Sequence, residues 1–325
     1  MGCLIYQLPN QEIKSFQGNW ISSSLKNLPD DVFFITDFTK EEVFYFEGIS
    51  KGNIDDLVLS SNADEEVFAV DGRYYLNGLQ HFIDGFDDYG IEKAIYSRIK
   101  LAKRGRTSPI EIFKKIASKY QQQALVYLVS DEVFGTWLGA TPEILLSGDK
   151  EQLESMALAG TKSKVDQQWT DKEIEEHQFV IDFIKEQIES QNPESLNIAE
   201  TKTVHAGEVF HLRTDFRFQI SSDKWNSLID SLHPTPAVCG TPMKNAKEYI
   251  LKFEPHDRKF YTGLLGWKGK DRLDIYVNLR CMQVLENYYA LYVGGGITKV
   301  SRLEDEWRET EHKSETLLTL ISNED

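Results

Sequence analysis

Two acidic residues and a lysine recur at helical spacing near the C-terminus, in the segment RLEDEWRETEHKSET (302–316). Glu306, Glu309 and Lys313 stand at i, i+3 and i+7, so a helix would present them on one face. Carboxylates gathered in this way from two helices would form a hard oxygen site suited to Mg²⁺. An ordinary solvated helix face has the same pattern, because surface helices are rich in such acidic pairs.

A second acidic pair lies in TDKEIEEHQFVIDFIKEQIES (170–190), the clearest helix that the sequence predicts. Glu173 and Glu176 stand at i and i+3 and are the other two candidate magnesium ligands. Thr170 and Glu173 also form a capping-box pattern, so Glu173 is either a ligand or only the partner of the cap. The stripe that should bury this helix consists of Ile174, His177, Ile181, Ile184 and Ile188.

Three glycines end the predicted strand LYVGGGIT (291–298). At Gly294, Gly295 and Gly296 the backbone could turn tightly and point successive N–H groups at an anion, although a plain turn has the same sequence. The run matches neither the phosphate-binding loop G-x-x-x-x-G-K-[ST] nor the spacing of a dinucleotide fingerprint. Nucleotide binding is therefore not indicated.

Arg280 lies in the middle of the predicted strand DIYVNLRCMQV (274–284), where it would face the same way as Tyr276, Asn278 and Met282. A guanidinium among such neighbours needs a partner. A ligand carboxylate held by two hydrogen bonds would serve, and so would a structural salt bridge.

Three further residues could take part in proton chemistry: Glu143 in GATPEILLS, Lys93 in GIEKAIYSR and His211 in VFHLRTDF. Burial can raise a carboxyl pKa enough for acid catalysis and lower an ammonium pKa enough for base catalysis. Periodicity alone selects none of them, and His211 by itself is typical of a core histidine.

The chain that must position these residues has 325 residues, 41% of them hydrophobic, as in a folded globular protein. We expect a single domain over residues 1–325. The net charge of −16 argues against binding to nucleic acid or to an anionic membrane surface. It also means that an anionic ligand would need a bound cation or local basic residues.

Cysteine spacing and the N-terminus bear on the compartment. Cys3, Cys239 and Cys281 show no C-x-x-C spacing, so neither a disulfide framework nor a zinc site is indicated. No signal-peptide pattern and no run of apolar residues long enough to span a membrane is present, so we expect a cytoplasmic protein.

Strand-like runs and helical periodicity alternate along the chain, which favours an α+β fold with mixed or antiparallel sheets covered by helices. Helices are expected over 109–122 and 170–190 and from Arg302 onwards. Strands are expected at 32–38, 41–49, 57–61, 74–79, 124–130, 136–148, 273–285 and 288–297, with a pair of strands within 203–220. Residues 90–106 read as a strand or short helix before a basic turn.

Eight motifs taken together resemble the chorismate-binding enzymes, in the order and spacing of that family. They are TPEILLS, ALAGTKSK, EEHQFVIDFI, LHPTPAVCGTP, DRKFYTGLLGW, YVNLRC, YVGGGI and EWRETEHKSETLL. The likeness covers roughly residues 90–320, whereas residues 1–89 match weakly and are shorter than usual for the family. The resemblance implies a large two-layered, mainly antiparallel β-structure with helices outside and two halves that resemble each other.

The resemblance also implies roles for the candidate residues. Glu176 and Glu306 would hold Mg²⁺, with Glu173 and Glu309 as direct or water-mediated ligands, and the metal would take the ring carboxylate of chorismate. The implied substrate-binding residues are Arg280, Tyr261 and the amides of Gly294, Gly295 and Gly296 for the enolpyruvyl carboxylate, Lys313 as a nearby positive charge, Gly160 and Thr161 along the ring, and His211.

The nucleophile that reaches C2 of chorismate distinguishes the family members, which all expel the C4 hydroxyl. The enzymes that use water are similar in having a lysine where this chain has Lys93, whereas the enzymes that use ammonia have glutamine there. Ala159 stands where aminodeoxychorismate synthases usually have a nucleophilic lysine. The turn LHPTPAVCG (232–240) looks like the isochorismate synthase form, so this activity is expected, with salicylate synthase as the second candidate.

In the mechanism that this resemblance implies, Lys93 takes a proton from the attacking water and protonated Glu143 gives one to the departing C4 oxygen. Less expected are an anthranilate or aminodeoxychorismate synthase component I and a binding subunit without catalysis. The expected partner is a small-molecule substrate, with Mg²⁺ as cofactor and a monomer or weak homodimer as the assembly. The pathway, menaquinone, siderophore or salicylate biosynthesis, stays open.

Overall fold

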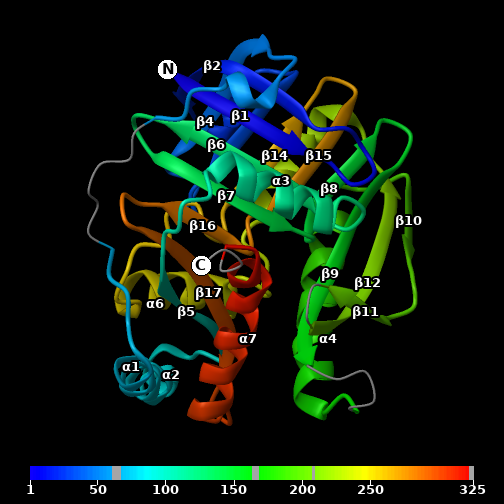
Figure 1. Cartoon of the computed structure of the whole chain (residues 1–325). Coiled ribbons are helices and arrows are strands. Elements are labelled where there is room, and N and C mark those ends of the chain that lie inside the picture. The colour runs from blue at the N-terminus through cyan, green and yellow to red at the C-terminus, as the bar shows by residue number, and fades with distance from the viewer. Residues whose placement is uncertain (61–66, 163–167, 207–208, 322–325) are drawn as a thin grey trace.

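A single sheet of 17 strands forms the framework in the computed structural model, which describes residues 1–60, 67–162, 168–206 and 209–321 (Figure 1). The strands are β1 (Gly2–Gln7), β2 (Lys14–Ser23), β3 (Val32–Thr36), β4 (Val43–Ser50), β5 (Lys93–Lys103), β6 (Leu125–Asp131), β7 (Gly135–Thr141), β8 (Ile144–Asp149), β9 (Leu153–Lys162), β10 (Ser195–Ile198), β11 (Lys202–Ala206), β12 (Val209–Gln219), β13 (Gly240–Thr241), β14 (Leu264–Lys268), β15 (Arg272–Val277), β16 (Cys281–Val284) and β17 (Tyr288–Thr298). The helices are α1 (Gly72–Asp84), α2 (Phe86–Tyr89), α3 (Pro109–Tyr120), α4 (Asp171–Ser190), α5 (Trp225–Leu232), α6 (Met243–Phe253) and α7 (Leu303–Ile321), with short 3₁₀ turns η1 (Leu25–Asn27), η2 (Ile54–Asp56) and η3 (Ser222–Lys224).

All the strand pairs are antiparallel, so the predicted α+β class with mainly antiparallel strands is confirmed. Followed from partner to partner, the sheet runs β12–β9–β8–β15–β14–β3–β4–β2–β1–β6–β7–β16–β17–β5–β13, with β10 and β11 both on β12. The first strands of the chain, β1 to β4, therefore lie in the middle of the sheet and connect its two arms.

The two arms contain equivalent units, each a β-hairpin followed by a long helix. In the first unit β8 and β9 lead into α4, and in the second β16 and β17 lead into α7. Each helix packs on the second strand of its own hairpin. The resemblance between halves that the sequence implied is visible in these two units (Figure 1).

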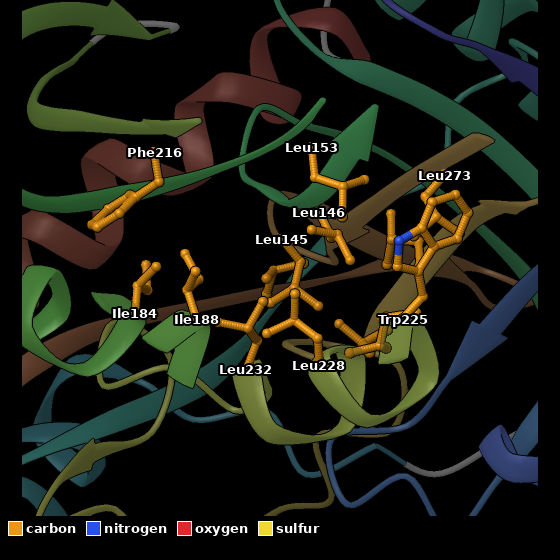
Figure 2. Packing of buried hydrophobic residues seen from close by; sticks show 14 of the residues in the cluster. Leu145, Leu146, Leu153, Ile184, Ile188, Phe216, Trp225, Leu228, Leu232 and Leu273 are labelled. Atoms are coloured by element: carbon orange, nitrogen blue, oxygen red, sulfur yellow. The ribbon is translucent and has the colours of Figure 1, made fainter. Parts of the chain in front are cut away.

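Helix α4 is held in place by an apolar face and a capped N-terminus. Val180, Ile184 and Ile188 are buried against β8, β9 and α5 (Figure 2). Thr170 and Glu173 form the predicted capping box. Ile174, which the sequence placed on the buried stripe, is 51% exposed, because the buried line begins one turn later.

Residues 74–79 are helical rather than a strand, a correction to the sequence prediction. They belong to α1, where Asp71 caps the N-terminus by accepting a hydrogen bond from the Tyr74 N–H. Tyr75, Leu79 and Phe82 are buried at helical spacing. The cap and this packing outweigh the β-propensity of the tyrosines.

The other corrections concern strand boundaries. Residues 57–60 form no regular strand, and the predicted strand 273–285 is broken into β15 and β16 by residues 278–280. The sequence prediction missed β1 and β2. The predicted helices at 109–122, at 170–190 and after Arg302 are confirmed as α3, α4 and α7.

Among the residues that the structure describes, no helix combines the length and apolar character needed to cross a bilayer. Cys3, Cys239 and Cys281 are buried free thiols.

Candidate active site

A pocket with about 1120 Å³ of empty space, part of it open to solvent, lies where the two hairpin–helix units meet β5. It receives side chains from α4 and α7, from β5, β9 and β17, and from the break between β15 and β16. Its lining includes Lys93, Glu143, Gly160, Glu173, Glu176, His211, Tyr261, Arg280, Gly294, Gly295, Gly296, Glu309 and Lys313. The structure thus brings together residues that are far apart in the sequence.

The glycine run lies inside β17 rather than in a turn, which corrects the sequence interpretation. Gly294, Gly295 and Gly296 pair with Ser97, Tyr96 and Ile95 of β5. These glycines form one wall of the pocket as flat, side-chain-free strand. The strand leaves space there for neighbouring side chains, and the predicted role of the glycine amides in substrate binding stays a prediction.

The space above this strand is occupied by the candidate acids and the lysine. A Cβ atom added at Gly296 would lie 2.7 Å from Cε of Lys93 and 3.4 Å from Oε1 of Glu176. A Cβ added at Gly295 would lie 3.4 Å from Oε2 of Glu306 and 3.5 Å from Oε1 of Glu309. The first group comes from β5 and α4, and the second from α7.

Lys93 and Glu176 form a buried pair next to the glycines of β17. Lys93 is 3% exposed, and its Nζ lies 3.9 Å from Oε2 of Glu176. Oε1 of Glu176 is buried and accepts no hydrogen bond from the described residues. A buried carboxylate oxygen in this state is costly, and a bound cation would satisfy it.

The other two carboxylates of the set are engaged within their own helices. Glu173 accepts a hydrogen bond of 2.8 Å from the Thr170 N–H and one from the Thr170 hydroxyl. It therefore acts as the partner of the helix cap, one of the two roles that the sequence allowed. Glu309 pairs with Lys313 at 2.7 Å. Within the described residues, no three histidine, cysteine or acidic side chains converge as a ready-made metal cage.

The donor set nevertheless fits Mg²⁺. Magnesium in enzymes is commonly held by one or two carboxylates together with water and groups of the substrate, rather than by an all-protein cage. Glu176, with its unsatisfied oxygen, and Glu306, which is 4% exposed above Gly295, are the two residues placed for this.

Glu143 is buried in the pocket wall just before β8. Burial raises its pKa to about 8, although Lys313, Lys93 and Arg280 act in the opposite direction. A carboxyl group with this pKa is mostly protonated at neutral pH and can donate a proton.

Arg280 does not lie in mid-strand, as the sequence suggested, but in the break between β15 and β16, with a positive φ of 46°. Its Nη2 lies 3.5 Å from Nε2 of His211. The Nδ1–H of His211 donates to the carbonyl oxygen of Gly160 at 2.8 Å. Burial and the nearby guanidinium lower the pKa of His211 to about 3, so the ring is neutral and Nε2 can accept from Arg280.

Lys313, Tyr261 and Gly294 form a second group on the wall. Lys313 Nζ donates to the carbonyl oxygen of Gly294 at 2.9 Å. A Cβ at Gly294 would lie 3.1 Å from the Tyr261 hydroxyl, so any larger residue would be tightly packed against Tyr261. The side chain of Thr161, and residues 163 and 164 of ALAGTKSK, lie outside the described part of the chain.

The sequence analysis missed the apolar part of the lining: Ile95, Leu158, Val238, Leu279 and Tyr292. Leu158, Val238, Leu279 and Tyr292 all fall inside motifs quoted above, which was the available signal. Ile95 lies outside those motifs, in β5, and the sequence alone does not give the register of that strand.

Comparisons with known proteins agree with this geometry. Residues 57–322 match the family model described as chorismate binding enzyme. Among curated proteins, the chain is 30% identical to isochorismate synthase DhbC of Bacillus subtilis, over 75% of this chain and 66% of the relative. It is 32% identical to isochorismate synthase EntC of Escherichia coli, over 58% of this chain and 51% of the relative. The chain thus spans between half and two thirds of their lengths.

Among solved structures, DhbC of Bacillus anthracis, described as a 2,3-dihydroxybenzoate-specific isochorismate synthase, superposes with a TM-score of 0.81 at 25% identity, over 99% of this chain and 96% of that one. MenF of Escherichia coli, the menaquinone-specific isochorismate synthase, superposes with a TM-score of 0.80 at 18% identity, over 99% and 89% of the two chains. The likeness to MenF concerns the fold.

Proposed function

Because the chain belongs to the chorismate-binding enzyme family, we propose that it is an isochorismate synthase, which converts chorismate reversibly to isochorismate with Mg²⁺. The observation that carries the proposal is the presence of a buried lysine and a buried, protonated carboxyl group in the same pocket, Lys93 and Glu143. Curated relatives named as isochorismate synthases support the choice within the family.

The charges of the pocket support a metal cofactor. Apart from Lys93, which is the proposed base, its lining has two basic side chains, Arg280 and Lys313, against the carboxylates of Glu173, Glu176 and Glu309. Chorismate is a dianion, and the protein around it has a net charge of −16. A cation held by Glu176 and Glu306 would offset the substrate's charge and orient its ring carboxylate.

The chain's own residues then carry out the proton transfers. Lys93, in its neutral form, takes a proton from water that attacks C2 while the ring double bonds shift. Glu143 gives its proton to the C4 oxygen as that oxygen leaves as water. In the reverse direction the two residues exchange roles. Arg280, which contacts His211, and Lys313 line the pocket and would hold the enolpyruvyl carboxylate.

The three buried thiols suit a reducing compartment, so we assign the reaction to the cytoplasm.

The test is to identify the products formed from chorismate and Mg²⁺ without ammonia. We expect isochorismate in a reversible mixture with chorismate and little pyruvate. Stoichiometric pyruvate would identify a salicylate synthase instead, and a product formed only with ammonium would identify an amino-transferring member of the family. No turnover at all from folded, chorismate-binding protein would indicate a binding subunit.

A variant tests the water-activating step. Lys93→Gln should remove the reaction with water, since an amide cannot accept the proton, and we expect a loss of ~10²–10⁴-fold in kcat. Lys100→Gln in the same strand, outside the pocket, is the matched control and should retain activity. A Lys93→Gln enzyme with wild-type kcat would overturn the assignment of Lys93 as the base.

A further inference from the structure

Arg98 is buried beneath α7, next to the helix face that lines the pocket. It lies in β5, five residues after Lys93, and is 2% exposed. Its Nε donates to the Thr310 hydroxyl at 2.9 Å, and its Nη2 pairs with Glu311. Its guanidinium carbon lies 4.0 Å from the centre of the Trp307 ring. All three partners belong to one helix.

These partners alternate along α7 with residues that face the pocket. Trp307 follows Glu306, and Thr310 follows Glu309. The same helix therefore offers two carboxylates to Gly295 and is held by Arg98 on an adjacent face. Because a helix moves as a rigid unit, the arginine fixes the distance between these carboxylates and β17.

Helix α1 and Lys100 also contact the first half of α7. Trp307 packs on Tyr75 of α1, with ring centres 5.3 Å apart. A Cβ at Gly72 would lie 3.3 Å from the Trp307 ring, so α1 approaches it closely. Lys100 also contacts Glu311, at 2.9 Å, but is less buried than Arg98.

Resting on the proposed function, we propose that Arg98 is a positioning residue for the magnesium-binding face of α7. A planar guanidinium can stack on Trp307 while it donates to Thr310 and Glu311, which a lysine ammonium cannot reproduce. Arg98 touches neither substrate nor metal in this role. It holds the part of α7 that carries Glu306 and Glu309 against β5.

The test measures metal binding as well as activity. Mn²⁺ binding is followed by electron paramagnetic resonance with chorismate present, in the Glu143→Gln background so that no turnover occurs. Removal of a residue that orients metal ligands typically costs ~10–100-fold in metal affinity. We expect Arg98→Lys to raise the Kd for Mn²⁺ within this range, and Glu311→Gln to raise it by a smaller factor.

With Glu143 restored, the Mg²⁺ concentration for half-maximal activity should rise in parallel, while kcat at saturating Mg²⁺ stays within a few-fold of the wild type. A loss of fold alone would lower kcat at every Mg²⁺ concentration. Lys100→Met, which removes the more exposed partner of Glu311, is the control and should leave the Kd almost unchanged.

A folded Arg98→Lys protein with the wild-type Kd for Mn²⁺ would overturn the positioning role and leave the proposed function intact. If Arg98→Lys does not fold, an unchanged Kd in Glu311→Gln has the same consequence. Absence of Mn²⁺ binding in the Arg98-containing parent would instead overturn the metal site itself, and the role of Arg98 with it.

Discussion

The units β8–β9–α4 and β16–β17–α7 have the same architecture but hold their helices by different means. Helix α4 is fixed by apolar side chains, with Ile184 and Ile188 at most 1% exposed (Figure 2). The first turns of α7 are fixed instead by the buried guanidinium of Arg98 and by Trp307. An acidic helix can therefore present carboxylates to a pocket without an extended apolar face beneath them.

The two helices also divide their carboxylates in the same way. In each, one acid of the pair has a partner in or next to its own helix: Glu173 in the cap and Glu309 with Lys313. The other acid, Glu176 or Glu306, is the buried member of its pair, at 9% and 4% exposed. This comparison predicts that Glu176 and Glu306 are equally necessary for activity and that Glu173 and Glu309 are less necessary.

Removal of the metal should have the largest effect. We expect EDTA to abolish turnover, and Glu176→Gln and Glu306→Gln each to lower kcat/KM by more than the ~10²-fold that loss of an outer-shell partner can cost. Steady-state kinetics across Mg²⁺ concentrations measure this. Full activity in EDTA would contradict the proposed metal site. A large loss from only one of the two variants would show that α4 and α7 do not contribute equally.

The proton donor comes next in size. Glu143 enters from the first unit, and Glu143→Gln keeps its shape but cannot donate a proton. We expect kcat to fall by ~10²–10⁴-fold while chorismate still binds, as titration calorimetry can show. Wild-type kcat in this variant would exclude Glu143 as the acid.

The pH dependence follows from the same residue. The pKa of Glu143 is raised from 4.5 to about 8, so the donor is protonated below this pH. The wild-type kcat/KM, which reports the groups of the free enzyme, should therefore fall as the pH rises through about 8. Because the folded-state pKa is the higher one, the protonated carboxyl's contribution to stability is complete below about 4.5 and is lost as the pH rises to about 8. Thermal melts of Glu143→Gln should lack this decline, and an unchanged profile in the variant would contradict the shift.

The sequence indicated the helices of this site better than its strands. Caps and 3.6-residue periodicity are local, so the capping box of Thr170 and Glu173 and the shared face of Glu306 and Glu309 could be read directly. The surroundings of the glycine run could not, because they depend on the pairing of Gly296 with Ile95, which lies far away in the sequence.

The roles of Lys93 and Glu143 were indicated by resemblance to a family and not by periodicity. Such residues become reactive through burial and charged neighbours. The charged neighbours here come from α4, α7 and the strand break around Arg280. A single sequence does not show that these distant segments meet. The contacts of Arg98 with α7 were missed for the same reason, since residues 90–106 read only as a strand or short helix before a basic turn.

Two neighbouring glycines allow a sharper comparison of the units, with a moderate expected effect. Gly296→Ala would place its Cβ 2.7 Å from Cε of Lys93, so the lysine must move. We expect kcat to fall by ~10–10²-fold, the scale of an ångström-sized displacement of a catalytic group. Gly295→Ala meets only ordinary contacts of 3.4 and 3.5 Å with Glu306 and Glu309 and is the matched control. Equal losses from both variants would contradict the geometry of the strand.

The smallest effect is expected at Glu173, and it decides whether this acid is a ligand or only a cap. Glutamine can replace glutamate in a capping box, so Glu173→Gln keeps the hydrogen bond from the Thr170 N–H and removes the charge. We expect kcat and the Mg²⁺ requirement to stay within a few-fold of the wild type. Glu173→Ala loses the cap as well and should lower the free energy of unfolding by about 1 kcal/mol, measured by urea denaturation. If Glu173→Gln instead loses as much activity as Glu176→Gln, then Glu173 leaves its cap to bind the metal, and α4 supplies two ligands rather than one.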